Sequence, residues 1–537
     1  MKYFIALKSE NEIIHYTDQY PTEDIIFKNV GNNYKLVLNA SKDYEFVEAR
    51  IVMDYSFNKK QELFLNGFQS WTDTFEYSIK DKMKDAKKIF KPLNNVFHFD
   101  RYGDSHFISY KKHTLHGFDF AYIKDELKPI AISSNNYKNA YLVIRFSFKD
   151  NLIILSCDAL GKKINKGESF TLFDFDINED INKMMDKYNE PKKAEKIFGY
   201  TSWYNHYQNI NEEIVSSCLD SLDSRFNLFQ IDDGYETFVG DWLDVDKNKF
   251  PNGLKELVDK AHSKNLLAGI WLAPFVAETK SRLFSEHPDY FVKDEEGNPI
   301  SCGGNWSGFY ALDMKQEKVR NYIKECLEYF MNLGFDFFKL DFLYASCIKD
   351  KDSLTKAERS RLSYEFLREV LKDKLILGCG AVLSSSYGLF DYMRIGPDVS
   401  LKFDDVFYMR FMHRERISTK ITLRNTIYRS IFDDKLFKND PDVFLLRDDN
   451  ISLSFEQKKA LVLINALFGS VLMTSDNIKD YDNKKNELLA LAFKLHNEAS
   501  NKSYKKNKDT IVVNYDLDGA KHEFIYYVKK GTIKELK

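Results

Sequence analysis

The sequence lacks the cysteine and histidine patterns of zinc-binding and disulfide-rich proteins. Its 6 cysteines in 537 residues contain no CxxC pair, the spacing on which most zinc sites and many redox motifs depend. None of the 11 histidines stands in an HExxH frame, the common zinc motif of metallohydrolases. We therefore expect no metal, no other cofactor and no disulfide framework, and a reducing compartment. A metal-dependent hydrolase stays open as an alternative.

The sequence also lacks a long apolar run and an excess of charge of one sign. The longest apolar stretch, 460–473, is too short to span a membrane and is interrupted by polar residues. The N-terminal MKYFIALKSE has no apolar segment of the length that secretion needs. Lys and Arg number 78 against 81 Asp and Glu, a net charge of −3, which argues against nucleic acid or an anionic membrane as a partner. We expect a cytoplasmic protein, and the sequence predicts no oligomeric state.

The composition changes twice along the chain, which predicts three domains. Up to about residue 185, short strand-like runs such as YLVIRFSF and NLIILSCDAL are separated by polar clusters, a pattern typical of an antiparallel β-sandwich. The charged stretch 176–196 is the candidate connection to the next domain. After about residue 480, a helix-like LLALAFKLH precedes the strand-like TIVVNY and EFIYYV. We predict an N-terminal β-sandwich at 1–185, a central domain at 186–480 and a small C-terminal β-domain at 481–537.

The central domain alternates short apolar runs with segments of helical period. The eight runs are FGYTSW, LFQIDDG, LLAGIWLAP, FYALDM, FDFFKLDF, LILGCGA, YMRIGPD and ALFGSVLMTSD. Between them, 316–333 is the clearest predicted helix, with Gly334 at its end. Eight strand–helix units predict an α/β fold class with a (β/α)8 barrel at its centre. A doubly wound sheet is the competitor, but the nucleotide-binding motifs GxGxxG and GxxxxGK[ST] are absent from the sequence.

Carboxylates follow five of these eight runs. A single aspartate after a strand usually caps a helix or forms a turn. Several carboxylates around one rim repel one another, and such a cluster is typical of a site that uses them. There is no GxSxG motif, and Cys379 in LGCGA has no neighbouring histidine, so a buried structural thiol is its default interpretation. The aspartates are Asp232 and Asp233, Asp313, Asp341, Asp398 and Asp476.

Carboxylate pairs acting on a neutral polyol are typical of glycoside hydrolysis, in which one group is the acid and another the nucleophile or base. Asp341 fits the nucleophile. In FFKLDF, Lys339 and Asp341 share one strand face at period two, so Lys339 stands beside Asp341 inside the barrel. A cation this close keeps a carboxylate ionised. The alternative for Lys339 is a structural ion pair with a neighbouring aspartate.

Asp398 fits the general acid. Gly396 and Pro397 interrupt the strand alternation just before it and turn the chain out of the barrel. Partial burial at the rim would help to keep this carboxyl group protonated, as a general acid requires. Arg394, in the same segment, is predicted to hydrogen-bond the substrate or one of the carboxylates, with a purely structural arginine as the alternative.

Tryptophans are predicted to supply sugar-stacking surfaces. An indole face packs against the apolar face of a sugar and its N–H donates a hydrogen bond, although a core position is the alternative for each ring. The adjacent Asp232 and Asp233 would accept hydrogen bonds from neighbouring sugar hydroxyls. The five tryptophans lie in or beside the runs above or in polar loops: Trp71, Trp203, Trp242, Trp271 and Trp306.

Several motifs together resemble glycoside hydrolase family 36, the bacterial α-galactosidases. They are, in order, NGFQSW, FQIDDGYE, GDWL, GIWLAPF, EHPDYFVK, YALD, FKLDFLYA, LGCG, RIGPDVS and LRNTIYRSIFDDKLFKNDPDVFLLRDDN. The resemblance implies a retaining, metal-independent enzyme in which Asp341 is the nucleophile and Asp398 the acid/base. It further implies that a subsite for the terminal sugar is lined by Trp71, Asp232, Asp233, Trp271, Lys339, Cys379 and Arg394.

The sequence thus predicts an exo-acting retaining α-galactosidase whose partner is a small α-linked oligosaccharide. Some relatives in the family cleave α-N-acetylgalactosaminides instead, so the same mechanism on that sugar is the close alternative. A catalytically silent carbohydrate-binding protein is a second class, which the presence of both Asp341 and Asp398 disfavours.

Overall fold

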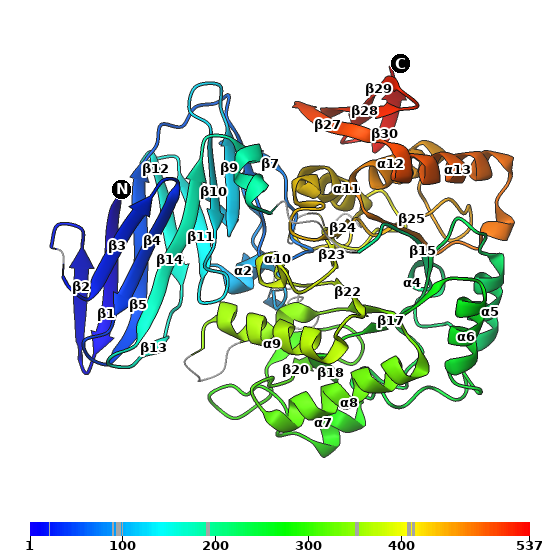
Figure 1. Cartoon of the computed structure of the whole chain (residues 1–537), viewed down its shortest axis with the longest axis horizontal. Helices are drawn as coiled ribbons and strands as arrows, with labels where there is room; N and C mark the ends of the chain where they lie inside the picture. The colour runs from blue at the N-terminus through cyan, green and yellow to red at the C-terminus, as the bar shows by residue number, and fades with distance from the viewer. Residues whose placement is uncertain are drawn as a thin grey trace.

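The computed structural model of the chain describes residues 1–536, except 21, 89–90, 93–97, 99, 189–193, 349–353, 405–409 and 411–413. An antiparallel β-sandwich, a (β/α)8 barrel and a small antiparallel sheet follow one another along the chain (Figure 1). This confirms the predicted α/β fold class and its three parts. The domain boundaries stay a prediction, and part of the predicted connection, 189–193, lies outside the described residues.

The N-terminal sandwich is built from a 14-stranded antiparallel sheet. Its central strands alternate buried and partly exposed side chains, because successive residues of a strand point to opposite faces. Ile5, Ile51 and Leu155 are fully buried in its core. The strands are β1 (Lys2–Ser9), β2 (Glu12–Thr17), β3 (Ile25–Val30), β4 (Asn33–Asn39), β5 (Tyr44–Asp54), β6 (Glu62–Leu65), β7 (Glu76–Ser78), β8 (Thr114–Phe118), β9 (Phe120–Lys124), β10 (Ile130–Ser134), β11 (Tyr141–Ser147), β12 (Leu152–Asp158), β13 (Lys163–Ile164) and β14 (Ser169–Asn178).

The barrel is a closed ring of parallel strands. Its sheet has the order β24-β23-β22-β21-β17-β16-β15-β26-β25, and only Pro441 and Asp442 separate β24 from β25. These two strands are therefore halves of one stave, broken where proline offers no N–H to the ladder. The strands are β15 (Ile197–Thr201), β16 (Leu228–Ile231), β17 (Leu267–Leu272), β21 (Phe337–Leu340), β22 (Leu375–Gly378), β23 (Tyr392–Arg394), β24 (Lys438–Asp440), β25 (Val443–Phe444) and β26 (Val471–Thr474).

One of the eight predicted barrel strands is wrong. FYALDM contains β20 (Phe309–Ala311), which pairs with β18 (Val276–Glu278) and β19 (Ser301–Gly303) in a separate antiparallel sheet. The missing stave is the split strand at 438–444. Its sequence, KNDPDVF, is mostly polar and contains proline, so it carries no apolar signal.

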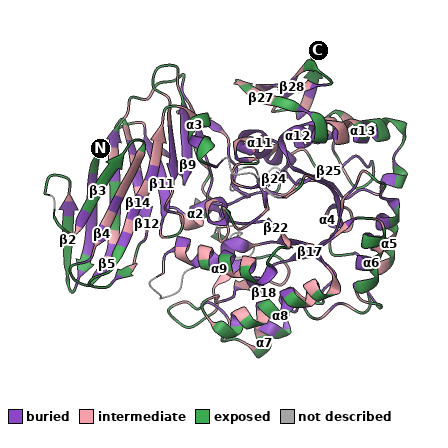
Figure 2. Ribbon diagram, in the orientation of Figure 1, coloured by how far each residue is buried: buried purple, intermediate pink, exposed green. Residues whose placement is uncertain are grey.

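Helices cover the outside of the barrel, and their buried faces point toward the strands (Figure 2). The predicted helix at 316–333 is α8, and it ends at Gly334, whose φ of +103° suits glycine. No helix among the described residues is long and apolar enough to cross a membrane. The helices of the barrel region are α4 (Trp203–His206), α5 (Glu212–Ser221), α6 (Lys255–Ser263), α7 (Arg282–Glu286), α8 (Glu317–Leu333), α9 (Lys356–Leu371), α10 (Leu383–Ser386), α11 (Thr419–Tyr428), α12 (Phe455–Phe468) and α13 (Asn483–Glu498).

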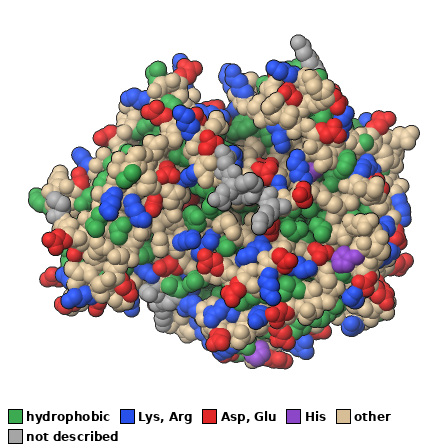
Figure 3. Space-filling view, in the orientation of Figure 1, with side chains coloured by type: hydrophobic (Ala, Val, Ile, Leu, Met, Phe, Trp, Pro, Cys, Tyr) green, Lys and Arg blue, Asp and Glu red, His purple; other side chains and the backbone are tan. Residues whose placement is uncertain are grey.

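The C-terminal sheet is a four-stranded antiparallel meander that lies beside α12 (Figure 1). It consists of β27 (Ser500–Asn507), β28 (Thr510–Leu517), β29 (Ala520–Tyr527) and β30 (Thr532–Glu535). Lys459 of α12 pairs with Glu535 at 2.7 Å. On the visible face of the whole molecule, acidic and basic side chains are intermixed (Figure 3), in keeping with the small net charge.

A loop after β6 carries the sandwich into the barrel. Arg429 holds this loop from a fully buried position, since it donates to Asn66 Oδ1 at 3.2 Å and to the carbonyl oxygens of Gln69 and Ile395. Burying a guanidinium costs free energy unless its donors are satisfied, so these bonds fix the loop in one place. The loop then delivers Trp71 to the carboxyl ends of the barrel strands.

Candidate active site

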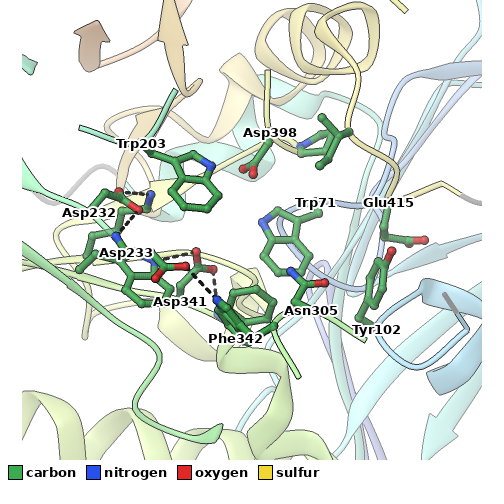
Figure 4. Close-up of a pocket in the computed structure, with 15 residues that line it drawn as sticks. Trp71, Tyr102, Trp203, Asp232, Asp233, Asn305, Asp341, Phe342, Asp398 and Glu415 are labelled. Atoms are coloured by element: carbon green, nitrogen blue, oxygen red, sulfur yellow. Dashed lines mark hydrogen bonds and ion pairs between the residues drawn. The ribbon is translucent and has the colours of Figure 1, made fainter. Parts of the chain in front are cut away.

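A pocket of about 150 Å³ opens at the carboxyl ends of the barrel strands (Figure 4). This is the end at which barrel enzymes place their active sites. In the view of Figure 4, Asp398 lies between the rings of Trp203 and Trp71, and Asp341 lies below Trp203, beside Phe342. The lining residues are Trp71, Tyr102, Trp203, Asp232, Asp233, Trp271, Asn305, Trp306, Lys339, Asp341, Phe342, Pro397, Asp398, Glu415 and Ile417.

Asp341 follows β21 directly and is only 8% exposed. Its two oxygens accept hydrogen bonds from Trp271 Nε1 at 3.1 Å and from the backbone N–H of Phe342 at 2.8 Å. Burial raises the pKa of Asp341, whereas the positive charge of Lys339 opposes that rise and the charge of Asp398 adds to it. The hydrogen bonds and the lysine therefore favour the anion in a pocket that otherwise disfavours it.

Lys339 lies two residues before Asp341 and faces the same interior. Its Nζ is 2.7 Å from Asp232 Oδ2 in a pair whose side chains are 5% and 3% exposed. Burial alone would lower the pKa of Lys339, but Asp232 outweighs it and raises the pKa above its usual value. Both interpretations of this lysine hold, because it pairs with an aspartate and also lines the pocket beside Asp341.

Asp232 and Asp233 follow β16 directly, and their carboxylates accept hydrogen bonds from different residues. Oδ2 of Asp232 also accepts from Thr201 and Gln230, so this oxygen is fully used inside the barrel. Asp233 accepts from Trp306 Nε1 at 2.9 Å. Burial raises the pKa of Asp233, even though neighbouring donors oppose the rise. Both aspartates line the pocket, where carboxylate oxygens suit sugar hydroxyls.

Asp398 stands at the rim, with its side chain 33% exposed. It accepts a hydrogen bond from Arg394 Nη1 at 2.9 Å. Arg394 itself is 1% exposed and is absent from the pocket lining among the described residues. It contacts the site through Asp398, from behind the wall.

Cys379 likewise lies behind the pocket wall and links two lining residues. Trp71 Nε1 donates to its sulfur at 3.4 Å, and the thiol lowers the pKa of Asp341, against the effect of burial. Burial raises the pKa of Cys379 well above its usual value. The thiol therefore stays neutral, as a structural cysteine should.

Gly380 makes room for Trp71. Its φ is +55°, and a Cβ built there would lie 2.9 Å from Trp71 Cζ2 and 3.2 Å from the Cα of Phe342. Real Cβ atoms essentially never approach another atom to 2.9 Å, and a non-glycine residue at positive φ is also strained. Glycine is thus required at this position by the indole that walls the pocket.

Replacing Gly380 with alanine is expected to displace Trp71 and to raise the KM for a pocket-binding sugar by about tenfold, or about 1.4 kcal/mol. Backbone strain adds a stability loss of about 1–2 kcal/mol. Gly388→Ala is the matched control, because Gly388 has a φ of +73° but nothing within 4 Å of its added Cβ. Thermal unfolding and KM measured together separate the two effects. An equal rise in KM in both variants would contradict the role of the Trp71 contact.

Seven of the nine predicted site residues line this one pocket, and two lie behind it. The two are Cys379 and Arg394, which reach the cavity only through Trp71, Asp341 and Asp398. Two further strand-end carboxylates are elsewhere. Asp313 ends the side sheet, and Asp476 is buried in an ion pair with Arg447 at 2.9 Å. Asp476 therefore has a structural role, as a single aspartate after a strand usually does.

Among the lining residues that do not follow a barrel strand, sequence reasoning missed four: Tyr102, Asn305, Glu415 and Ile417. Tyr102 comes from the sandwich domain and Glu415 from the segment before α11. Glu415 is 5% exposed and accepts at 2.8 Å from both Thr72 Oγ1 and the N–H of Asp104. None of them follows a barrel strand, so the strand-end pattern carried no signal for them. Among the described residues, no group of three or more His, Cys, Asp or Glu side chains is arranged to hold a metal ion.

Part of the barrel region matches a known family. The family model for melibiase matches residues 182–372. An α-galactosidase of Pediococcus pentosaceus is 30% identical over 147 residues, which are 26% of this chain and 19% of that protein. An A-type blood α-D-galactosamine galactosaminidase of Flavonifractor plautii is 31% identical over 192 residues, 31% of this chain and 18% of that one. The aligned segments thus span about a fifth of the length of these curated relatives.

Solved structures share the whole architecture. The α-galactosidase of Thermus thermophilus, in complex with p-nitrophenyl α-D-galactopyranoside, superposes with a TM-score of 0.71 at 22% identity, over 93% of this chain and 98% of that one. The family 36 α-galactosidase AgaA of Geobacillus stearothermophilus gives a TM-score of 0.60 at 11% identity, over 98% and 79% of the two chains. At these identities the likeness concerns the fold. With the melibiase match and the sequence relatives, it makes the chain similar to the α-galactosidases of glycoside hydrolase family 36.

Proposed function

We propose that the protein is a retaining exo-α-galactosidase that removes terminal, non-reducing α-linked galactose from small oligosaccharides. The observation that carries this proposal is the presence of Asp341 and Asp398 in one tryptophan-walled pocket. Most glycoside hydrolases use two carboxyl groups that flank the bond they cleave. The Thermus structures with p-nitrophenyl α-galactoside and with stachyose support the choice of sugar.

In the proposed mechanism, Asp341 is the nucleophile. Its carboxylate attacks the anomeric carbon while the bond to the leaving oxygen breaks, which gives a covalent glycosyl-enzyme. Lys339, Trp271 and the N–H of Phe342 favour the anion that this step consumes. Asp398 donates its proton to the leaving oxygen, then takes one from the water that releases the sugar. Two inversions at the anomeric carbon give net retention.

The pocket also supports a mechanism that needs a tightly held sugar. Trp71, Trp203, Trp271 and Trp306 provide aromatic surfaces around a small cavity. Asp232 and Asp233 then fix the sugar through its hydroxyl groups, a contact that strongly penalises a ligand lacking them. A small pocket at the end of the barrel suits the end of a sugar chain better than its middle, which supports exo-action.

The second candidate is an α-N-acetylgalactosaminidase with the same mechanism. The Flavonifractor relative, which acts on an amino sugar according to its name, favours keeping this alternative. The two activities differ only at the sugar's 2-position. The Thermus structures with p-nitrophenyl α-galactoside and with stachyose support galactose as the first choice.

Nitrophenol release from the two aryl α-glycosides separates these candidates. We expect kcat/KM for the α-galactoside to exceed that for the α-N-acetylgalactosaminide by about tenfold or more. Proton NMR of the first product formed should show α-galactose. The reverse preference would favour the second candidate, β-galactose as first product would contradict retention, and no turnover of either substrate would favour a carbohydrate-binding protein.

We further propose a cytoplasmic location and the division into 1–185, 186–480 and 481–537. All six cysteines are free and buried, which fits a reducing compartment. The proposed partner is a small oligosaccharide, with neither nucleic acid nor membrane involved.

A further inference from the structure

Arg394 holds three carboxylates at once, each through a different nitrogen. Its Nη1 is 2.9 Å from Asp398 Oδ1, its Nε 2.9 Å from Asp440 Oδ2 and its Nη2 2.8 Å from Asp442 Oδ1. The guanidinium is 1% exposed, and the side chains of Asp440 and Asp442 are fully buried. One positive charge is therefore divided among three acids, of which only Asp398 reaches the pocket.

Asp442 lies in the break of the split stave and is held from several elements. Its Oδ2 accepts hydrogen bonds from the hydroxyl of Tyr204, in α4, and from the N–H of Val399 at 2.7 Å. Asp440 Oδ1 accepts the N–H of Asp442 at 2.8 Å. Among the described residues, the charged and titratable groups facing Asp442 are Arg394, Asp398, Asp440 and Tyr204.

The charges of this cluster do not balance. With all three acids ionised, the group carries a net charge of −2 in a buried place, which is costly. Burial is the main cause that raises the pKa of Asp442 to about 7; Asp398 and Asp440 add to the rise, whereas Arg394 and Tyr204 oppose it. The surroundings of Asp442 therefore favour a proton on this carboxyl group.

We propose that Asp442 is a positioning residue that competes with Asp398 for Arg394 and thereby sets the pH range in which Asp398 works as an acid. The inference rests on the proposed function and goes beyond it, because Asp442 does not touch the pocket. When Asp442 is ionised it draws Arg394 toward itself, so Asp398 keeps its proton to higher pH. When Asp442 is neutral, Arg394 favours the ionised form of Asp398 instead.

The test is the pH dependence of kcat/KM for Asp442→Asn. This variant cannot ionise, so the alkaline limb is expected about one pH unit lower than in the wild type, within the ordinary range of such shifts. At acidic pH the two curves should converge. The loss above neutral pH should be larger for an α-galactosyl disaccharide than for a nitrophenyl galactoside, since the better leaving group needs less protonation.

Two further variants keep the test independent of folding. Tyr204→Phe removes only the hydroxyl that favours ionised Asp442, so a shift of the same sign but smaller is expected. Asp433→Asn is the matched control: Asp433 is half-buried, its pKa is likewise raised chiefly by burial, and it accepts from the N–H of Asn439 at 2.8 Å, but it faces Ser470 and not Arg394. Its pH profile should match the wild type even if its melting temperature falls.

An unmoved alkaline limb in both Asp442→Asn and Tyr204→Phe, in folded protein, would overturn the inference and leave the proposed function standing. The same shift in Asp433→Asn would also overturn it, because the effect would then be general. If the wild type hydrolyses neither aryl glycoside, the proposed function fails and this inference fails with it.

Discussion

Asp341→Ala is expected to lower kcat on nitrophenyl α-galactoside by about 10⁴-fold or more, the scale seen when a covalent nucleophile is removed. The reason is that Asp341 lies in the pocket beside Lys339 and keeps an ionised carboxylate with two hydrogen-bond donors, whereas Asp232, which also lines the pocket, is held in an ion pair with Lys339. Steady-state kinetics on purified protein measures this loss. Circular dichroism and the melting temperature should show an intact fold, because the side chain is part of a solvent-connected pocket.

Asp336→Ala is the matched control for this experiment. Asp336 lies at the opposite, amino end of the same stave, where it pairs with His262 at 2.8 Å and Lys374 at 3.1 Å. Its removal should cost some stability and leave kcat within about twofold, because it is far from the chemistry. An inactive Asp336→Ala, or an active Asp341→Ala, would show that the carboxylate of Asp341 is not the nucleophile.

The reaction of Asp341→Ala with azide is a second test of the nucleophile. A small anion that takes the place of the missing carboxylate attacks the anomeric carbon from that side, forms the C–N bond and expels nitrophenolate with the bonding electron pair. This is one displacement with inversion, so Asp341→Ala should yield β-galactosyl azide. Formation of the α-azide would place Asp341 outside the nucleophile's role.

The difference in melting temperature between the wild type and Asp341→Ala should also depend on pH. The pKa of Asp341 is raised in the folded state, chiefly by burial. The folded protein therefore binds its proton more tightly than the unfolded chain does, and the wild type loses that stabilisation as the pH rises through the folded pKa. The melting temperature of Asp341→Ala relative to the wild type should thus rise from about pH 4 toward neutrality.

The aspartates of this site could be predicted because they follow barrel strands in the sequence. Asp232, Asp341 and Asp398 each follow an apolar run, and barrel topology brings such ends to one face whatever their separation in sequence. The lysine beside Asp341 was predictable from the period of two along a strand. These signals depend only on neighbouring residues, so they can be recognised in the sequence without the folded structure.

Other features depend on contacts between distant segments, which no local pattern encodes. The split stave has a polar sequence because its residues face the Arg394 cluster. Glu415 is fixed by Thr72 and Asp104, which lie more than 300 positions earlier in the chain. FYALDM, in contrast, has the pattern of a strand and is one, but pattern does not determine which sheet a strand joins.

Asp398→Ala is expected to separate substrates by their leaving groups. For an α-galactosyl disaccharide, whose leaving sugar must be protonated, kcat/KM should fall by about 10²–10⁴-fold, the usual contribution of a general acid. For nitrophenyl galactoside the fall should be about tenfold or less, because nitrophenolate leaves without a proton. Comparing kcat/KM isolates the first chemical step, since it covers events only up to the formation of the glycosyl-enzyme.

The same variant has a distinctive response to azide. With Asp341 intact, the glycosyl-enzyme still forms, but its hydrolysis is slow because no base activates the water. Azide needs no such base, so it attacks the anomeric carbon from the face opposite Asp341. Two inversions then give α-galactosyl azide and a faster release of nitrophenol. The opposite anomers expected from Asp341→Ala and Asp398→Ala assign the two roles independently of rate. If Asp398→Ala lost activity equally on both substrates and gave no α-azide, Asp398 would not be the acid/base, and the Arg394 cluster would have to serve another purpose.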